Sequence, residues 1–206
     1  MTGNHDSEKA AKILGAAFDL FLEQGYEATG VRQICRVAGV ELTTLYYHFN
    51  SKKGLFLWLA DSLRDAFIPG IPMSAHTGSS QDYLRDYFFI SMQYALNHQK
   101  ETRFFLRYSL FPPQELREEI ALFLKNNQHR KNESIVPHMN DCIGRGSVDL
   151  PLEKAMMAYW QFINDNTFNA VFSGWSPDEM EMMHLWQTFM HCRLFRRRFN
   201  DMGVSV

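Results

Sequence analysis

The chain has 206 residues, 46% hydrophobic and 21% charged, which is enough for one large globular domain or two small ones. Its formal net charge of −2 excludes a general attraction to nucleic acid, so any such contact must come from a local patch. The polar segment 1–12 predicts no signal peptide, and no apolar run approaches the roughly 20 residues that span a membrane. We therefore expect a cytoplasmic protein.

The cysteines Cys35, Cys142 and Cys192 are odd in number and far apart, which favours a reducing compartment without disulfides. His184 and His191 lie near Cys192, but the histidines are seven residues apart and no second cysteine pair accompanies them. This spacing is not that of a zinc site. We expect neither a metal nor a cofactor.

Helical periodicity begins in residues 8–24, which Gly25 ends, and it places five apolar side chains on one stripe. These are Ile13, Ala16, Ala17, Leu20 and Phe21. Thr29 is expected to cap a second, short helix that stops near Gly39. A third short helix is expected over about 41–48, and Ser51 caps a fourth over about 52–67.

The stretch 68–81 carries two prolines and two glycines and is predicted to be a loop. Five further helices are expected near 82–98, 101–111, 114–143, 152–173 and 178–199. No alternating strand pattern is found, so the fold class is all-α. We expect an N-terminal helix-turn-helix domain over 1–51. A helical ligand-binding and dimerisation domain follows over 52–206, beginning with the connecting helix 52–67.

Two short helices joined by Ala38, Gly39 and Val40 have the sequence form of a helix-turn-helix, whose second helix enters the DNA major groove. At 100° per residue, Leu42, Leu45 and Phe49 share one sector, and Tyr46 borders it. Thr43, Thr44 and Tyr47 fall on the opposite side, flanked by Glu41 and His48. The first sector is expected to anchor the helix in a small core. The second offers hydroxyls and an aromatic ring to base edges and phosphates.

Cations surround this helix, because Arg32 and Arg36 precede it and Lys52 and Lys53 follow it, while Glu41 is the one acidic residue between 29 and 53. The sequence therefore predicts a locally positive patch suited to phosphates.

The segment "ILGAAFDLFLEQGYEATGVRQICRVAGVELTTLYYHFNSKKGL" resembles the DNA-binding domain of the tetracycline-repressor (TetR) family of bacterial transcription regulators. The resemblance rests on short matching elements in unbroken register over about 45 residues. They are Ala16-Ala17, Leu20-Phe21, Gly25-Tyr26, Thr29, Val31, Ile34, Ala38-Gly39-Val40, Leu45-Tyr46, His48-Phe49, Ser51-Lys52 and Leu55.

The resemblance implies a DNA interface made by Thr29, Arg32, Glu41, Leu42, Thr43, Thr44, Tyr46, Tyr47, His48 and Lys52. Within it, Lys52 would hold a phosphate at a helix N-terminus. Some alternatives stay open. Arg32 is otherwise a solvated surface charge, Leu42 and Tyr46 are otherwise packing residues, and His48 otherwise closes its helix.

Three positions depart from the family pattern. Glu41 stands where serine or threonine is common; a glutamate accepts from cytosine or caps the helix, but it repels phosphate. Gly30 removes one expected phosphate contact. Cys35 replaces an alanine, and we interpret it as a small buried apolar residue.

The C-terminal two-thirds is rich in aromatic residues and methionines, as a helical core is. By the same resemblance it would enclose a cavity for an apolar or aromatic effector, or a cationic one. The candidate lining residues are Met92, Phe105, Tyr108, Trp160 and Asn164. The helices near 152–173 and 178–199 would form the homodimer seam, because they carry Phe162, Phe168, Phe172, Trp186 and Phe189.

The sequence thus predicts a homodimeric DNA-binding transcription regulator, a repressor that binds a palindromic operator and is released by a small molecule. Two other classes remain as alternatives. One is a protein-interaction adaptor that kept the fold and lost its operator. The other is an enzyme that uses the C-terminal cavity, although no nucleophile–base pair, phosphate loop or metal motif supports it.

Overall fold

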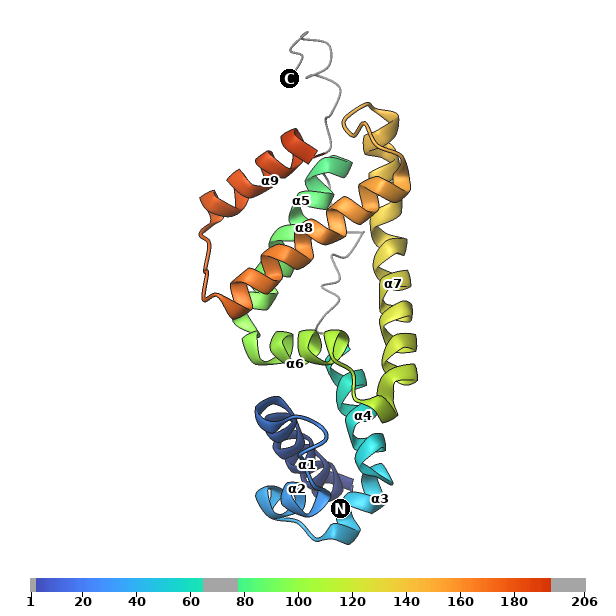
Figure 1. The fold of residues 1–206 in the computed structure, drawn as a ribbon, viewed down its shortest axis with the longest axis vertical. Helices are drawn as coiled ribbons and strands as arrows, with labels where there is room; N and C mark the ends of the chain where they lie inside the picture. Colours follow the sequence, from blue (N-terminus) through green and yellow to red (C-terminus); the bar gives the residue numbers. More distant parts are fainter. Residues whose placement is uncertain (1–2, 65–77, 194–206) are drawn as a thin grey trace. The chain divides into compact units, whose positions relative to one another are not determined.

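The computed structural model describes residues 3–64 and 78–193, and in this part of the chain every regular element is a helix (Figure 1). The expected all-α class is confirmed. These residues form two compact units. The first contains residues 3–64 and 100–124, and the second contains residues 78–99 and 125–193.

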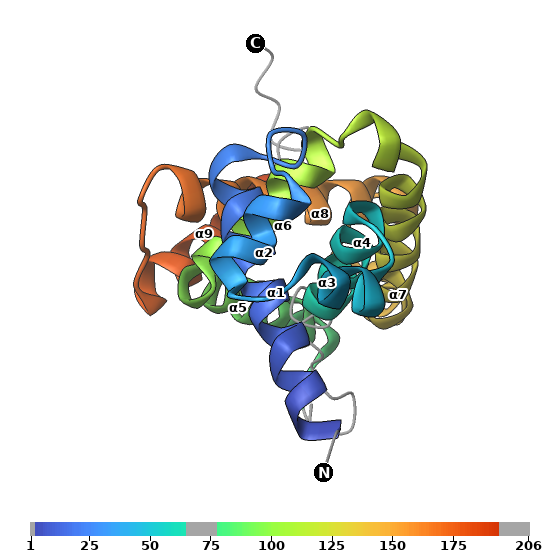
Figure 2. The ribbon, with the colours of Figure 1, turned by 90° about the horizontal axis from the view of Figure 1, so that it is seen from below.

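The first unit begins with four helices, α1 (Gly3–Gln24), α2 (Val31–Ala38), α3 (Leu42–Phe49) and α4 (Lys52–Arg64). α1 contacts each of the other three, and α3 contacts both α2 and α4. Figure 2 shows α2, α3 and α4 following one another at this end of the chain. The predicted helix 52–67 is observed as far as Arg64, and its last residues and most of the predicted loop 68–81 lie outside the described residues.

The ends of these helices follow from a few local contacts. Gly25, at φ 88°, ends α1 with its N–H bonded to the Phe21 carbonyl at 3.1 Å, as predicted. The Ser51 hydroxyl accepts from the Gly54 N–H at 2.9 Å and starts α4, also as predicted. The predicted cap of α2 is wrong. Gly30 is the N-cap residue, because the Thr29 hydroxyl is buried and donates to the Gly25 carbonyl at 2.7 Å.

The same unit also contains α6 (Gln99–Leu110), the 3-10 helix η2 (Gln114–Leu116) and the start of α7 (Arg117–Gly144). The rings of Phe104 and Tyr108 pack on Phe56, with centroids 5.6 and 4.8 Å apart. The Tyr108 hydroxyl donates to the Phe21 carbonyl at 2.9 Å, and the Arg107 guanidinium donates to the Leu22 carbonyl at 2.8 Å. We call this first unit, residues 3–64 and 100–124, the head.

The second unit consists of α5 (Ser80–Asn97), the remainder of α7, α8 (Leu152–Phe172) and α9 (Glu179–Arg193). α5 starts at a capping box, in which Ser79 and Asp82 each bond the other's backbone N–H. α5 and α8 pack side by side (Figure 1). α9 packs on α8 through the stacked rings of Phe162 and Phe189, 4.2 Å apart. Residues 194–199, with most of the arginine-rich run, lie outside the described residues.

None of the described helices is long and apolar enough to cross a membrane.

Candidate nucleic-acid interface

α3 is held to the head by its apolar side. Leu45 is completely buried and Phe49 is 5% exposed, and the Phe49 ring meets the Trp58 ring of α4 edge to face at 5.9 Å. Leu42 is partly buried against the same core. The predicted inward sector of this helix is therefore confirmed for Leu45 and Phe49.

The opposite side of α3 is open. Tyr47 is 76% exposed and Tyr46 is 43% exposed, and Thr43 is exposed between them and the start of the helix. His48 is half-buried, with its ring 5.0 Å from that of Tyr47 in an edge-to-face contact. Three hydroxyl groups and two large aromatic rings are thus exposed, on a helix that the core fixes in place.

The turn between α2 and α3 requires a glycine. Gly39 adopts φ 67° and ψ 37°, a left-handed conformation that side chains with a Cβ rarely adopt. The Val40 N–H then bonds the Cys35 carbonyl at 3.0 Å and closes α2. Glu41 occupies the N-cap position of α3, but its side chain makes no capping hydrogen bond and is exposed. The negative charge of Glu41 therefore stands free at the start of the helix.

The cations around α3 are not equivalent. Arg32 and Arg36 are exposed on α2. Lys52 instead donates to the carbonyl oxygens of Tyr26 and Thr29, at 2.8 and 3.1 Å. Lys53 pairs with Glu119 at the start of α7. The two lysines expected in the positive patch are thus engaged within the head. The partners of both lysines lie far away in the sequence, so the residues next to the lysines do not predict these contacts.

Thr29 also faces the interior. It is 1% exposed, and besides its bond to Gly25 its hydroxyl accepts from the Gln24 amide at 3.2 Å. Of the residues expected at the interface, those at the surface of the head are Arg32, Glu41, Thr43, Tyr46 and Tyr47, with Leu42, Thr44, His48 and Lys52 half-buried.

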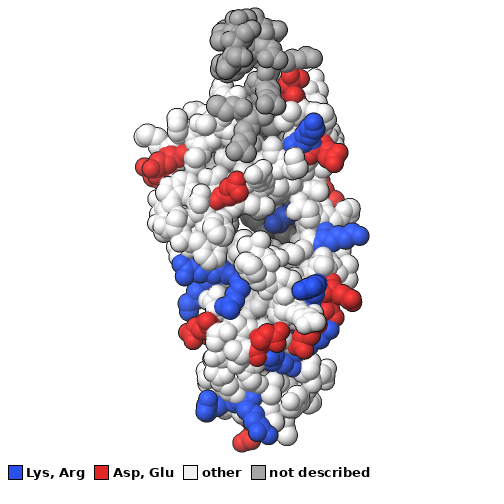
Figure 3. All heavy atoms as spheres, in the orientation of Figure 1, with Lys and Arg blue, Asp and Glu red and all other residues white. Residues whose placement is uncertain are grey.

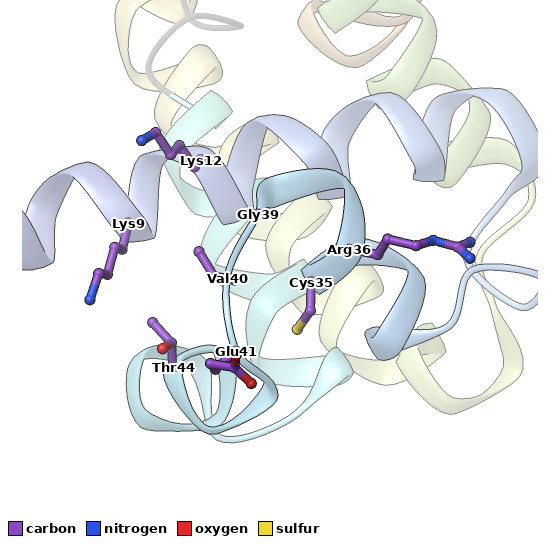
Figure 4. A pocket seen from close by; sticks show the side chains of 8 residues that line it. All are labelled: Lys9, Lys12, Cys35, Arg36, Gly39, Val40, Glu41 and Thr44. Atoms are coloured by element: carbon purple, nitrogen blue, oxygen red, sulfur yellow. The ribbon is translucent and has the colours of Figure 1, made fainter.

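A surface pocket of about 420 Å³ lies beside the turn (Figure 4). It is lined by Lys9, Lys12, Cys35, Arg36, Gly39, Val40, Glu41 and Thr44. The two lysines come from α1 and were missed by sequence reasoning, because their position next to α3 depends on how α1 crosses the motif. Lys12 is paired with Glu8 at 2.7 Å, and in Figure 4 the Arg36 guanidinium points away from the lysines. The pocket is lined by basic residues, but their charged groups do not converge on one point.

Cys35 lies at the wall of this pocket, 5% exposed. Burial, and then the charge of Glu41, raises the pKa of its thiol. A raised pKa disfavours the reactive thiolate. Its burial confirms the interpretation of Cys35 as a small apolar residue.

The candidate effector-binding residues fall into different units. Phe105 and Tyr108 lie on α6, where Tyr108 is buried in the head core. Met92 and Trp160 pack in the core of the second unit, with Met92 completely buried. Asn164 is exposed on α8. Among residues that the structure describes, no group of three or more His, Cys, Asp or Glu side chains is placed to hold a metal ion.

A helix fixed by its apolar side, preceded by a helix of equal length and a left-handed glycine turn, defines a helix-turn-helix DNA-binding domain. Comparison with known proteins agrees. Residues 13–59 match the family described as bacterial regulatory proteins, tetR family. Residues 13–59 of this chain therefore form a TetR-type DNA-binding domain.

The similarity to individual relatives covers part of each chain. The HTH-type transcriptional regulator RutR of Escherichia coli is 26% identical over 119 residues, 58% of this chain and 56% of RutR. QacR of Staphylococcus aureus is 46% identical over 46 residues, 22% of this chain and 24% of QacR. The chain thus matches little more than half the length of RutR and about a quarter of QacR.

The solved structure of the fatty acid degradation regulator FadR from Bacillus halodurans has a TM-score of 0.67 at 17% identity. It covers 90% of this chain and 97% of its own. At that identity it shows that the two proteins share a fold.

Proposed function

We propose that this chain is a transcriptional repressor. Two copies bind a palindromic operator through α3, and a small molecule bound in the second unit releases them. The coarser part of this proposal, a TetR-type helix-turn-helix domain, rests on the matches above.

The observation that carries the proposal is the contrast between the two sides of α3. Leu45 has no exposed surface, while Tyr47, two residues later, is 76% exposed. A large aromatic side chain held outward by a fixed helix loses little conformational entropy when it binds. Its hydroxyl and ring suit phosphates and thymine methyl groups. A DNA groove is the partner that best accounts for this surface.

The proposed dimer uses α8 and α9. Phe168 and Phe172 are 45% and 49% exposed on α8, with ring centroids 4.6 Å apart, and Met180 is 80% exposed at the start of α9. Exposed apolar clusters of this kind mark interfaces. Trp186 and Phe189, which were expected in the same seam, are each 4% exposed because they fill the core of the second unit.

The proposed release of DNA needs a connection between effector and head. α7 supplies one through the chain itself, because it starts in the first unit and continues into the second. Its first turn is tied to α4 by the Lys53–Glu119 ion pair, and Glu115 in η2 accepts from the Tyr26 hydroxyl. A coupling of about 1–3 kcal/mol is enough for five- to 150-fold control of affinity.

The experiment is selection of bound duplexes from a random pool at near-physiological salt, followed by titration of the recovered sequence at several salt concentrations. A recovered palindrome with half-sites about one helical turn apart, and affinity that falls steeply with salt, supports the proposal. Sedimentation of the complex then gives the number of chains bound. Recovery of no common sequence contradicts it.

The second candidate is a protein-interaction adaptor that kept the fold. Glu41 at the start of α3 favours the adaptor, because its exposed side chain makes no capping hydrogen bond and its charge repels phosphate. Binding that ignores sequence, or no binding, supports the adaptor. Glu41→Ser tests what Glu41 does if the chain binds DNA. It strengthens binding to all DNA if Glu41 only repels phosphates, and relaxes specificity at one position if Glu41 reads a cytosine. Turnover of a metabolite without DNA binding would support the enzyme alternative.

A further inference from the structure

Lys131 in the middle of α7 is a cation without a matching anion among the described residues. Its side chain is half-buried, and burial lowers the pKa of its ammonium with no charged group contributing to the shift. No carboxylate among the described residues forms an ion pair with it. Its Nζ lies over the face of the Trp160 ring on α8, 5.8 Å from the ring centroid. Partial burial of an ammonium costs some stability unless an anion reaches it.

Asn127 is a second, independent polar group left without a partner. It is 4% exposed, and both its Nδ2 and its Oδ1 are buried without a hydrogen bond. It precedes Lys131 by four residues, which places both side chains on the same side of α7, one turn apart. Buried polar groups normally find partners, so an unpaired amide beside an unpaired ammonium indicates a missing ligand.

Trp160 forms a fixed wall next to Lys131. Its Nε1 donates to the Asn132 Oδ1 at 2.9 Å, and the Tyr87 ring of α5 meets it edge to face at 5.7 Å. The Tyr87 hydroxyl is itself buried without a partner. Figure 3 shows the surface hollowed on the face between α7 and α8. Three helices of the second unit thus contribute a cation, polar groups and an aromatic wall.

We propose that Lys131 and the amide of Asn127 bind the carboxylate of the small-molecule effector, whose apolar part lies against Trp160. This rests on the proposed function, because it names the chemical class of the ligand that the repressor senses. An ammonium repels a cationic effector, so the site excludes the cationic alternative. One ammonium and one amide match a singly charged group better than a phosphate, which usually has more cations around it.

The first test measures stability without any ligand. Lys131→Met keeps the length of the side chain and removes its unpaired charge, so the melting temperature should rise by about 2–4 °C. Asn127→Leu should act in the same direction. The control is Lys125→Met, an exposed lysine on the same helix, which should leave the melting temperature unchanged. A fall in melting temperature on Lys131→Met contradicts the proposal, because Lys131 would then be paired within the protein.

The second test titrates the full chain by calorimetry with decanoate and naphthalene-1-carboxylate, their neutral amides, and decyl phosphate. At least one acid should bind, and its amide should bind about ten- to a hundredfold more weakly. Lys131→Met should remove that difference, and Lys125→Met should keep it. Equal affinity for acid and amide, no binding of either acid, or discrimination that survives Lys131→Met overturns the proposal. So does tighter binding of decyl phosphate than of decanoate.

Operator binding by the unaltered chain distinguishes the proposed carboxylate site from the proposed repressor function. Acid binding that depends on Lys131 in a protein without an operator leaves the site standing and removes the repressor. A sequence-specific DNA-binding protein that ignores every acid leaves the repressor and removes the site.

Discussion

The ammonium of Lys52 lies 4.1 Å above the ring of Tyr26 and donates to the carbonyl oxygen of the same residue at 2.8 Å. A second bond, at 3.1 Å, reaches the Thr29 carbonyl. The lysine at the N-terminus of α4 therefore fastens the loop after α1. Lys52 thus stabilises the fold at a position where the family pattern places a phosphate contact.

Lys52→Ala should therefore destabilise the head by about 1–3 kcal/mol, because two carbonyl oxygens lose a charged donor. Urea unfolding followed by circular dichroism measures this. Arg32→Ala is the control. Arg32 is exposed, so its removal should change stability by less than about 0.5 kcal/mol while weakening operator binding. If Lys52→Ala weakens DNA binding at unchanged stability, the lysine leaves its carbonyl partners to hold a phosphate.

Tyr47→Ala and Phe49→Ala should separate binding from folding, two positions apart on one helix. Tyr47→Ala should weaken operator binding by about 1–3 kcal/mol and leave the melting temperature nearly unchanged, since the ring is 76% exposed. Phe49→Ala should cost about 3–5 kcal/mol of stability, because its ring is buried. Fluorescence titration of labelled operator and thermal unfolding provide the two readouts. Unfolding of the Tyr47 variant would show that its ring supports the core.

Gly54→Ala should destabilise the head although alanine is the better helix former. A Cβ at this position would overlap the carbonyl oxygen of Phe49, so the end of α3 must move away from α4. Gly15→Ala is the matched control in α1. A Cβ there meets nothing within 4 Å, and the change should stabilise by about 0.5–1 kcal/mol. Equal and favourable effects of the two changes in chemical unfolding would contradict this packing of α3 on α4.

The stability of the head should decline in alkali through Tyr108. Burial raises the pKa of its phenol to about 12 from the ordinary 10.0. A raised folded-state pKa means that the stabilisation is complete below about pH 10 and is lost as pH rises through the folded-state value, because the unfolded chain ionises first. Tyr108→Phe should cost about 1 kcal/mol at neutral pH, through the lost bond to the Phe21 carbonyl, and should flatten the decline. Urea unfolding at pH 7 to 11 tests both, and an identical slope in the variant rules Tyr108 out as the source.

Much of the recognition helix was predictable from sequence, because its geometry is local. Residues 100° apart on a short helix place Leu45 and Phe49 inward and Tyr47 outward whatever the rest of the chain does. The glycine turn and the Ser51 start of α4 are equally local. Thr29 shows the limit of this reasoning, because its hydroxyl has a nearby carbonyl at Gly25 that competes with the helix N-terminus.

The sequence by itself determined the all-α class, the helix-turn-helix and the outward face of α3, since helical periodicity and turn residues act over a few positions. Only the tertiary structure decided which charges remain free. Lys53 meets Glu119, 66 positions later, and Lys131 meets no described carboxylate at all. It also placed Tyr108 in the head and Met92 in the second unit. Such pairings depend on how helices far apart in sequence cross, and no local pattern encodes that.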